Sequence, residues 1–499
     1  MAQGRTRIVI AGGGSAGWMA AAALRRFLGP DHAVCLIESE AVGTVGVGEA
    51  TIPQLRLFNA ALGIDEDEFM RACGGSFKLG IQFDGWRKPG EVYLHAFGNV
   101  GRDVGLTGFQ HLWLRARSLE LAGELGDYCL NAVAADAGRM HRGAALTAKA
   151  IPPLPYAFHF DAALYAAFLR RRAETGGVVR HEGRILSVER DGESGEVRAL
   201  LLEGDRRIEG DFFVDCTGFR ALLIGDALGV GYRDWRRWLP CDRAVAAPSA
   251  AMPPLPPYTR ATAHEAGWQW RIPLQHRTGN GLVYCSDYLD DDAAEAMLVD
   301  LIGGSPSAPP RRLRFVTGMR ERGWCHNVVA MGLSSGFLEP LESTSIHLIQ
   351  TAISRLLQLF PRAGGDSAAL RREYNRQLDF EMARIRDFLI LHYWANERSE
   401  PFWVDRRAAG LPDSLAERIA LWRDSAVIVR EHEELFTEAG WIQVLIGQGV
   451  IPHSWHPLAD TISAEELSEY LVTLNTLYRR EVARYADHDA TIAAGSAMR

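Results

Sequence analysis

The sequence lacks the paired cysteines that a disulfide framework or a zinc site would require. Its seven cysteines are spread along the chain from Cys35 to Cys325, and none belongs to a CxxC pair. This spacing is typical of reduced thiols in a cytosolic protein. We therefore expect neither disulfides nor a bound metal ion.

Long hydrophobic runs are also missing. No stretch approaches the roughly 20 uninterrupted apolar residues that a membrane-spanning helix needs. No cleavable hydrophobic region precedes the strand-like Ile8-Val9-Ile10. We expect a soluble, cytoplasmic protein that has no membrane partner.

A strong excess of one charge is absent as well. The 54 Lys and Arg residues nearly balance the 62 Asp and Glu residues, and the net charge of −8 is small for 499 residues. Because the basic residues are scattered, nucleic acid is not expected as a partner. With 47% hydrophobic and 23% charged residues, the chain has the composition of a globular protein with two or more substructures.

The beginning of the chain has the pattern of a βαβ unit. Residues 7–11 form a short apolar run, the alanine-rich segment 18–28 suits a helix that Gly29-Pro30 stops, and a second apolar run covers residues 33–37. This order predicts a parallel sheet. Residues 178–214 instead suggest an antiparallel meander. Beyond Thr344 the chain is expected to be mostly helical, and Ser463-Ala464-Glu465-Glu466 fits a capping box that opens a helix toward Tyr485.

A dinucleotide-binding pattern lies between the first strand and the first helix. Residues 12–17 read Gly-Gly-Gly-Ser-Ala-Gly and match GxGxxG. Backbone amides and a helix N-terminus at such a turn can receive a pyrophosphate, and Glu38 at the end of the second strand can hydrogen-bond ribose hydroxyls. The predicted contacts are Gly12, Gly14, Ser15, Ala16, Gly17 and Glu38. The pattern alone fits NAD or FAD.

Later features favour FAD over NAD. The strand end at residues 214–218 resembles the second flavin-contacting strand of FAD oxygenases, which adds Asp215 to the predicted cofactor contacts. We find no second GxGxxG for a nicotinamide cofactor.

Two further segments carry unusual residues. Residues 267–273 read GWQWRIP, and tryptophans at a spacing of two on a strand project to the same face. Residues 75–83 read GSFKLGIQF, in which Lys78 is flanked by apolar residues and would be partly desolvated. Taken alone, the first segment is more often an ordinary core strand and the second a surface lysine that snorkels to water.

A third segment, residues 336–347, reads GFLEPLESTSIH. It leads into a helix with an apolar stripe that ends before Pro361. Ser and Thr are expected to cap this helix, and its free amides together with the helix dipole make an anion site. A chloride or bromide could lie there on the backbone of Thr344 and Ser345. Alone, the segment is a plain helix start.

Together these segments resemble the flavin-dependent tryptophan halogenase family through most of the chain. Residues 47–53 (VGEATIP), 385–388 and 392–393 agree with that family too. The resemblance implies an α/β fold with a Rossmann-like FAD-binding domain that carries an antiparallel sheet, as in flavin monooxygenases, plus a mainly helical substrate-binding region. The expected boundaries are 1–350 for the FAD-binding module, with substrate-contacting insertions at about 60–160, and 351–499 for the helical region.

The resemblance also implies a mechanism. Reduced FAD from a separate NAD(P)H flavin reductase, O2 and chloride or bromide would give hypohalous acid, which would travel inside the protein to Lys78. Lys78 would hold and activate it by a hydrogen bond or as a haloamine. Glu342 would assist and accept the proton that the aromatic ring loses, with Ser343 orienting the pair. Trp268 and Trp270 would separate the flavin from the substrate. Ala50 and Gly332 join the expected cofactor contacts.

The substrate follows less directly from the resemblance. His95 and Phe97, in the segment YLHAFG, are candidates for contacting the aromatic ring, although a half-buried strand of core aromatics reads the same way. Family members that take free tryptophan carry a Tyr-Tyr pair and a Glu, where residues 441–449 read WIQVLIGQG. Without that carboxylate, an ammonium loses about 1.5–3 kcal/mol. We expect indole or an indole-bearing compound rather than free tryptophan, with Trp441 and Gln448 as further contacts.

Two other functions fit parts of the pattern. One is an FAD-dependent aromatic monooxygenase that hydroxylates its substrate, and the other is a non-catalytic flavin-binding redox protein. The sequence leaves open the natural substrate, the position of attack, the preferred halide, the identity of the reductase and the oligomeric state, a homodimer included.

Overall fold

The computed structural model describes residues 5–41, 48–149, 151–362 and 367–497. The chain forms two compact units, each assembled from three separate segments. Unit 1 comprises Met1–Gly75, Phe160–Arg236 and Arg314–Met382, and unit 2 comprises Ser76–His159, Arg237–Leu313 and Ala383–Arg499. The boundary expected at residue 350 stays a prediction.

A six-stranded sheet forms the centre of unit 1, with the strand order β21-β22-β13-β1-β2-β9. Neighbouring strands from β22 to β9 pair in parallel, and the edge strand β21 is antiparallel. The inner strands are almost continuously buried, as expected for a parallel sheet covered on both faces. The bounds are β1 Thr6–Ala11, β2 His32–Glu38, β9 Val179–Glu182, β13 Phe212–Asp215, β21 Trp324–Cys325 and β22 Val328–Ala330.

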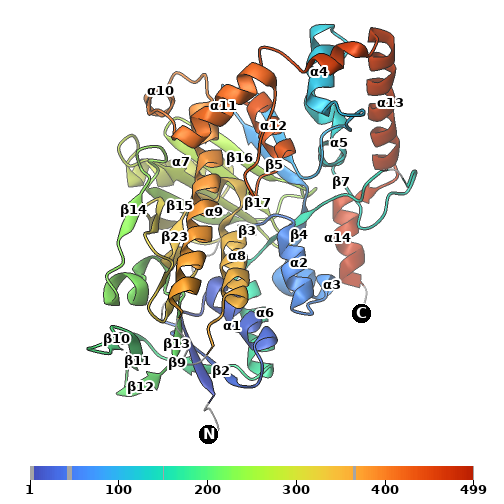
Figure 1. The fold of residues 1–499 in the computed structure, drawn as a ribbon. Coiled ribbons are helices and arrows are strands. Elements are labelled where there is room, and N and C mark those ends of the chain that lie inside the picture. Colours follow the sequence, from blue (N-terminus) through green and yellow to red (C-terminus); the bar gives the residue numbers. More distant parts are fainter. Residues whose placement is uncertain (1–4, 42–47, 150, 363–366, 498–499) are drawn as a thin grey trace. The chain divides into compact units, whose positions relative to one another are not determined.

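Helices of unit 1 pack beside this sheet (Figure 1). Helix α1 (Ser15–Phe27) contacts β2, α6 (Ala162–Thr175) and α8 (Ser345–Gln358). Two shorter helices follow the second strand, α2 (Gln54–Ala61) and α3 (Glu66–Cys73), and they pack on α8 and α6 respectively. The predicted βαβ unit and the α/β class are therefore confirmed, with α1 beginning three residues earlier than expected because its first turn includes part of the glycine motif.

The predicted antiparallel meander is only partly correct. Strands β10 (Ile185–Arg190), β11 (Val197–Leu202) and β12 (Arg206–Glu209) do form an antiparallel sheet. The first and last strands of that stretch, β9 and β13, instead join the parallel sheet of unit 1. Strand β13 is buried along its whole length, which suits the centre of a parallel sheet. A small sheet of β14 (Tyr232–Asp234), β20 (Gly318–Arg320) and β23 (Gly336–Phe337) completes unit 1.

A seven-stranded sheet forms the centre of unit 2, with the order β19-β15-β18-β17-β16-β5-β6. From β15 to β6 neighbouring strands pair antiparallel, except β16 and β5, which pair in parallel. Helix α7 (Asp291–Ile302) packs on β15 and β18, and α12 (Glu438–Gly447) packs on β6. The bounds are β5 Gly80–Asp84, β6 Val92–Ala96, β15 Arg243–Ser249, β16 Thr259–His264, β17 Gly267–Pro273, β18 Thr278–Tyr284 and β19 Arg311–Arg314.

A separate pair of strands in unit 2 carries the lysine singled out in the sequence. Strand β4 (Ser76–Lys78) pairs antiparallel with β8 (Ala157–Phe160), so that Ser76 lies opposite His159 and Lys78 opposite Ala157. All three residues of β4 are buried. The lysine therefore stands on an interior strand.

The later part of the chain is mostly helical, as predicted. Helix α9 (Ala368–Trp394) contributes residues to both units, and the helices that follow it belong to unit 2. The predicted capping box at Ser463 and Glu466 is present. Along the described ranges, no helix is both long and apolar enough to cross a membrane. The remaining elements are α4 Phe109–Ser118, α5 Leu130–Asp136, β7 Arg139–Met140, α10 Pro401–Ala408, α11 Asp413–Ser425, α13 Ala464–Val482, β24 Ala486–Asp487 and α14 His488–Ala497.

Candidate active site

The glycine turn of unit 1 is shaped by close backbone approaches. Gly12 has a φ of +107°, and a Cβ there would lie 2.2 Å from the carbonyl oxygen of Cys216. A Cβ at Gly17 would lie 1.8 Å from the carbonyl oxygen of Gly12, whereas a Cβ at Gly14 would meet nothing within 4 Å. Two of the glycines therefore permit tight packing, and the third faces open space, which is the arrangement needed for a ligand to approach the backbone.

Helix α1 begins directly at this turn. Gly14 is its N-cap residue, no side chain caps the helix, and the first turn contains no acidic residue. The amides of the first turn, which includes Ser15 and Ala16, carry the positive end of the helix dipole. This end of the helix is suited to bind an anionic group such as a pyrophosphate.

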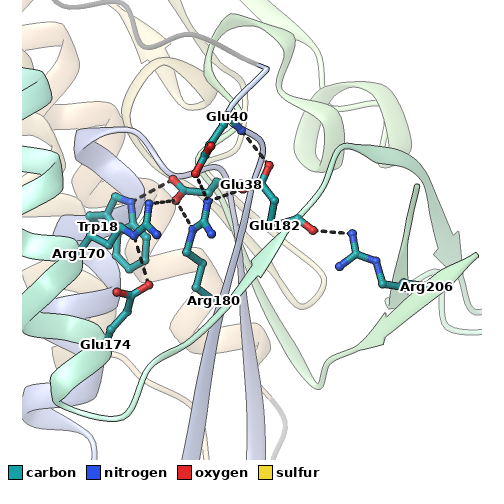
Figure 2. A network of polar contacts seen from close by, with 8 residues as sticks. All are labelled: Trp18, Glu38, Glu40, Arg170, Glu174, Arg180, Glu182 and Arg206. Carbon is teal, nitrogen blue, oxygen red and sulfur yellow. Dashed lines mark hydrogen bonds and ion pairs between the residues drawn. The ribbon is translucent and has the colours of Figure 1, made fainter. Parts of the chain in front are cut away.

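Glu38 lies beside the turn at the end of β2 (Figure 2). Its carboxylate accepts hydrogen bonds from Arg180 Nε at 2.6 Å, Trp18 Nε1 at 3.2 Å and Arg170 at 3.4 Å. A Cβ at Gly13 would lie 1.6 Å from Glu38 Oε2, so the carboxylate rests against the glycine turn. The two arginines come from α6 and β9, far along the chain, and no sequence signal linked them to Glu38.

Asp215, at the end of β13, uses its carboxylate within the protein. Oδ1 accepts from the amide and hydroxyl of Thr217 at 3.0 and 2.7 Å, and Oδ2 accepts from the amides of Leu223 and Ile224, both at 2.9 Å. These bonds fix the loop whose Cys216 carbonyl meets Gly12. The structure thus gives Asp215 a role in shaping the turn.

Two predicted cofactor contacts lie on other turns of unit 1. Gly332 has a φ of +62°, and a Cβ there would lie 3.0 Å from the Cβ of Ala16, which puts this turn against the first turn of α1. Ala50 is buried in the short strand β3 (Glu49–Ala50), where burial raises the pKa of the neighbouring Glu49 to about 7. Val47, in the matched VGEATIP segment, lies outside the described residues.

The segment before α8 forms an unusual helix start. Glu342 ends a short 3₁₀ turn, Ser343 is left-handed with a φ of 59°, and Thr344 is the N-cap of α8. The predicted cap by a Ser or Thr side chain is wrong, because Thr344 makes no side-chain cap bond. Its Oγ1 is buried and has no hydrogen-bond partner among the described residues. Ser345 opens the helix, and Glu342, Ser343 and Thr344 are all buried.

Lys78 of unit 2 is fully buried rather than snorkelling to water. Its Nζ lies 5.4 Å from the ring centroid of Phe97. An ammonium over an aromatic face is stabilised by the ring quadrupole. The structure thus brings together two of the predicted residues, one expected to handle the halogen and one expected to contact the substrate ring.

The other predicted substrate residues lie in an aromatic cluster of unit 2. The ring centroids of His95 and Phe388 are 5.6 Å apart. Phe388 also stacks on Phe436, with centroids 3.8 Å apart, and meets Trp441 edge-on at 4.7 Å. Gln448 donates from Nε2 to the carbonyl of His392 at 2.7 Å. His95, Trp441 and Gln448 are buried. Phe436 was not predicted, because nothing in its surrounding sequence marks it.

Trp268 and Trp270 project from one face of β17, as their spacing predicted. Both are buried, and their ring centroids are 6.1 Å apart. Trp270 lies opposite Gly281 of β18, where a Cβ would fall 2.0 Å from Trp270 Cζ2. The glycine therefore makes room for the indole ring, a requirement that only the strand register reveals.

Comparison with known proteins agrees with these features. A sequence model of the family described as tryptophan halogenase matches residues 7–464. Tryptophan 6-halogenase SttH from Streptomyces toxytricini is 37% identical over 494 residues, which cover 92% of this chain and 93% of SttH.

Two solved structures are also similar along nearly their full length. Xcc4156, a flavin-dependent halogenase from Xanthomonas campestris, is 49% identical with a TM-score of 0.95, covering 99% of this chain and 98% of that one. BrvH, a flavin-dependent halogenase from Brevundimonas sp. BAL3, is 44% identical with a TM-score of 0.94, covering 98% and 99%. The chain therefore belongs to the tryptophan halogenase family and is a flavin-dependent halogenase.

Proposed function

We propose that unit 1 binds FAD in a Rossmann-like arrangement at the glycine turn. The open space at Gly14, the uncapped start of α1 and the carboxylate of Glu38 fit a pyrophosphate and an adenosine ribose. Ser15, Ala16 and Gly332 would line the same place, and Ala50 would contact the cofactor from β3. When bound, reduced FAD with O2 supplies the oxidising equivalents that turn a halide into hypohalous acid.

We propose the start of α8 as the halide site. The amides of Thr344 and Ser345 would hold chloride or bromide at the positive end of the helix dipole. Two observations support this proposal: the side chain of the N-cap residue Thr344 makes no cap bond, and its buried hydroxyl has no partner among the described residues. A bound halide would satisfy groups that otherwise carry a desolvation cost.

Lys78 and Glu342 carry the proposed chemistry. The ammonium of Lys78 would hold the oxygen of hypohalous acid by a hydrogen bond. The ring carbon then bonds to the halogen as the halogen–oxygen bond breaks, the oxygen takes a proton from the Lys78 ammonium and leaves as water, and Glu342 accepts the ring proton. Ser343 would orient Glu342. Burial supports both assignments, because buried charged groups act as strong directional partners; their pairing rests on the family resemblance.

Trp268 and Trp270 would form a wall on the flavin side of the substrate. Two buried indole rings on one strand face exclude water and substrate from the space that they fill. A substrate kept away from the flavin is halogenated rather than hydroxylated.

We propose an indole-like substrate rather than free tryptophan. The observation that carries this proposal is that Gln443 and the amide nitrogen of Gln448 are hydrogen-bonded within the protein. Gln443 accepts from the amide of Ala96 at 3.0 Å and donates to its carbonyl at 3.1 Å, and Gln448 donates to the carbonyl of His392. Residues 441–449 contain no carboxylate to pair with an ammonium. His95 and Phe97 remain the proposed ring contacts.

We propose that a separate NAD(P)H flavin reductase delivers the reduced cofactor. The chain has one GxGxxG pattern, which the proposed FAD site uses, and no second one for a nicotinamide. A reductase of unrelated origin would then serve as well as the natural one.

Competition between indole and tryptophan tests the substrate proposal. Both compounds, at equal concentration, are supplied with FADH2 from a reductase, O2 and bromide, and the brominated products are quantified by isotope pattern. We expect kcat/KM for indole to exceed that for tryptophan by at least about tenfold, the effect of one missing charged hydrogen bond. A clear preference for tryptophan would overturn the proposal.

A further inference from the structure

Three buried side chains of unit 2 form a continuous hydrogen-bonded chain beside Lys78. Ser76 Oγ lies 2.5 Å from the carbonyl oxygen of Pro273 and 3.0 Å from His159 Nδ1, and His159 Nε2 lies 2.9 Å from Thr259 Oγ1. Ser76 and His159 are fully buried, and Thr259 is nearly so. The chain links four strands: β4, β8, β16 and β17.

The direction of each bond follows from the number of protons available. A carbonyl oxygen can only accept, so the single hydroxyl proton of Ser76 must go to Pro273. His159 Nδ1 must therefore donate to Ser76. In a neutral ring Nε2 is then unprotonated and accepts from the Thr259 hydroxyl. The chain runs Thr259 to His159 to Ser76 to Pro273 and fixes the tautomer of His159.

The surroundings keep the His159 ring neutral. Burial, reinforced by the charge of Lys78, holds the pKa of His159 well below its usual 6.5. A neutral ring can donate at one nitrogen and accept at the other, whereas a protonated ring would donate at both. The order of donors is therefore the same throughout the pH range near neutrality.

The hydrogen-bonded chain includes a residue of the strand that carries Lys78. Ser76 precedes Lys78 by two residues on β4, so both side chains leave the same face of the strand. Pro273 ends β17, the strand that carries Trp268 and Trp270. The chain thus ties the strand of the lysine to the strand of the tryptophan wall.

A second histidine holds the next residue of β4. The amide of Phe77 donates to His488 Nε2 at 3.0 Å, and His488 Nδ1 lies 2.8 Å from the carbonyl of Leu255, to which it donates. Two consecutive residues before Lys78 are therefore fixed by buried histidines from distant segments. Because both residues that precede it on β4 are anchored, Lys78 has little freedom to move.

We propose that His159, Thr259 and Ser76 are positioning residues that hold Lys78 in register with the tryptophan wall, so that the oxidised halogen reaches the substrate instead of escaping. This inference rests on the proposed role of Lys78. The three residues touch neither substrate nor cofactor. Their effect is on the capture of hypohalous acid and not on its formation.

The test measures how oxidising equivalents are divided between substrate and solvent. Full-length protein with FADH2 from a reductase, O2, bromide and catalase is given indole and an excess of N-acetylmethionine, which hypobromous acid converts to its sulfoxide. Bromoindole divided by the sum of bromoindole and sulfoxide gives the captured fraction. We expect Thr259→Val, which removes the donor to His159, to lower this ratio about tenfold, the effect of one lost buried hydrogen bond.

Matched variants separate positioning from general stability. Thr259→Ser keeps the hydroxyl and should restore most of the captured fraction. Thr317→Val removes another buried hydroxyl, one without a hydrogen-bond partner among the described residues, and should leave the fraction unchanged. FAD affinity, followed by flavin fluorescence, and the total of both products should stay at the wild-type level in all three variants.

Two results would overturn the inference. A Thr259→Val protein that unfolds at a lower temperature but captures the wild-type fraction would show that the hydrogen-bonded chain serves stability alone. If the valine variant does not fold, Thr259→Cys, a weaker donor, gives the same readout. If Lys78→Ala also captures the wild-type fraction, the proposed role of Lys78 fails, whereas failure of the inference alone leaves Lys78→Ala impaired.

Discussion

At the scale of the residue, Lys78 stands out because a buried ammonium is costly. Moving such a charge out of water costs several kcal/mol unless other groups interact with it. The ring of Phe97, 5.4 Å from Nζ, provides one favourable contact. Natural proteins seldom keep an ammonium in the interior without a function for it, and handling an oxidised halogen away from water is such a function.

Gly281 is a second residue whose identity the structure explains. It carries no strained φ, so an alanine would be tolerated by the backbone, but the new Cβ would fall 2.0 Å from the ring of Trp270. We expect Gly281→Ala to lower the free energy of unfolding by about 1–3 kcal/mol, the usual cost of overpacking a core. Urea denaturation followed by tryptophan fluorescence measures the change.

Gly304→Ala is the matched control for this substitution. A Cβ at Gly304 would meet nothing within 4 Å, so its free energy of unfolding should stay within about 0.5 kcal/mol of the wild-type value. A Gly281→Ala protein as stable as the Gly304→Ala protein would contradict the packing of Trp270 against this glycine.

At the scale of the element, local patterns predicted what local forces decide. The strand, turn and helix at the N-terminus and the capped helix α13 follow from periodicity and capping within about 20 residues of chain, and the structure confirms them. Strand β9 was assigned to the wrong sheet because its partner, β2, lies some 140 residues earlier. Its exposed ends and mixed composition carry no signal for a parallel partner.

The start of α8 shows the same limit within a single element. The Ser-Thr-Ser run correctly predicted where the helix begins, but not that Ser343 is left-handed and Thr344 makes no side-chain cap. A cap depends on a side-chain rotamer that tertiary packing selects. Whether the first amides of the helix are free to bind an anion depends on that rotamer.

The candidate site shows a similar division between near and distant residues. Single residues such as Lys78 and Glu38 stood out by their immediate neighbours. Their surroundings did not, since Arg180 contacts Glu38 from 142 residues away and His159 bonds Ser76, on the strand of Lys78, from 83 residues away. Such partners follow from strand pairing, which one sequence does not reveal.

At the scale of the whole molecule, buried histidines set the response to acid. Full or partial burial lowers the pKa of six of the described histidines, so each prefers to be neutral in the folded protein; they are His111, His159, His181, His264, His347 and His488. In the unfolded chain their pKa returns to about 6.5. Below that pH the unfolded chain binds more protons, so stability falls as the pH decreases.

This linkage gives a pH prediction. Each such histidine contributes up to about 1.4 kcal/mol per pH unit between its unfolded and folded pKa values. Glu49, whose pKa burial raises to about 7, acts in the opposite direction but is a single group. Urea denaturation should therefore show the free energy of unfolding falling by more than about 1.4 kcal/mol from pH 6 to pH 5. A constant or rising value would contradict neutral buried histidines.

The residues proposed for the separate steps of the reaction are divided between the two units. Lys78 is the third residue of unit 2 after the chain first leaves unit 1. The proposed FAD and halide residues belong to unit 1. Each unit can therefore be tested for its own part of the reaction. FAD binding, proposed for unit 1, should be unchanged when Lys78 of unit 2 is replaced.

The most direct measurement is bromination of indole by the Lys78→Ala protein in the presence of excess N-acetylmethionine and catalase. We predict wild-type FAD affinity, a wild-type total of bromoindole and sulfoxide, and bromoindole reduced at least about a hundredfold, because hypobromous acid is still made but no longer held for the ring. Bromoindole at the wild-type rate would show that the buried lysine takes no part in halogen transfer.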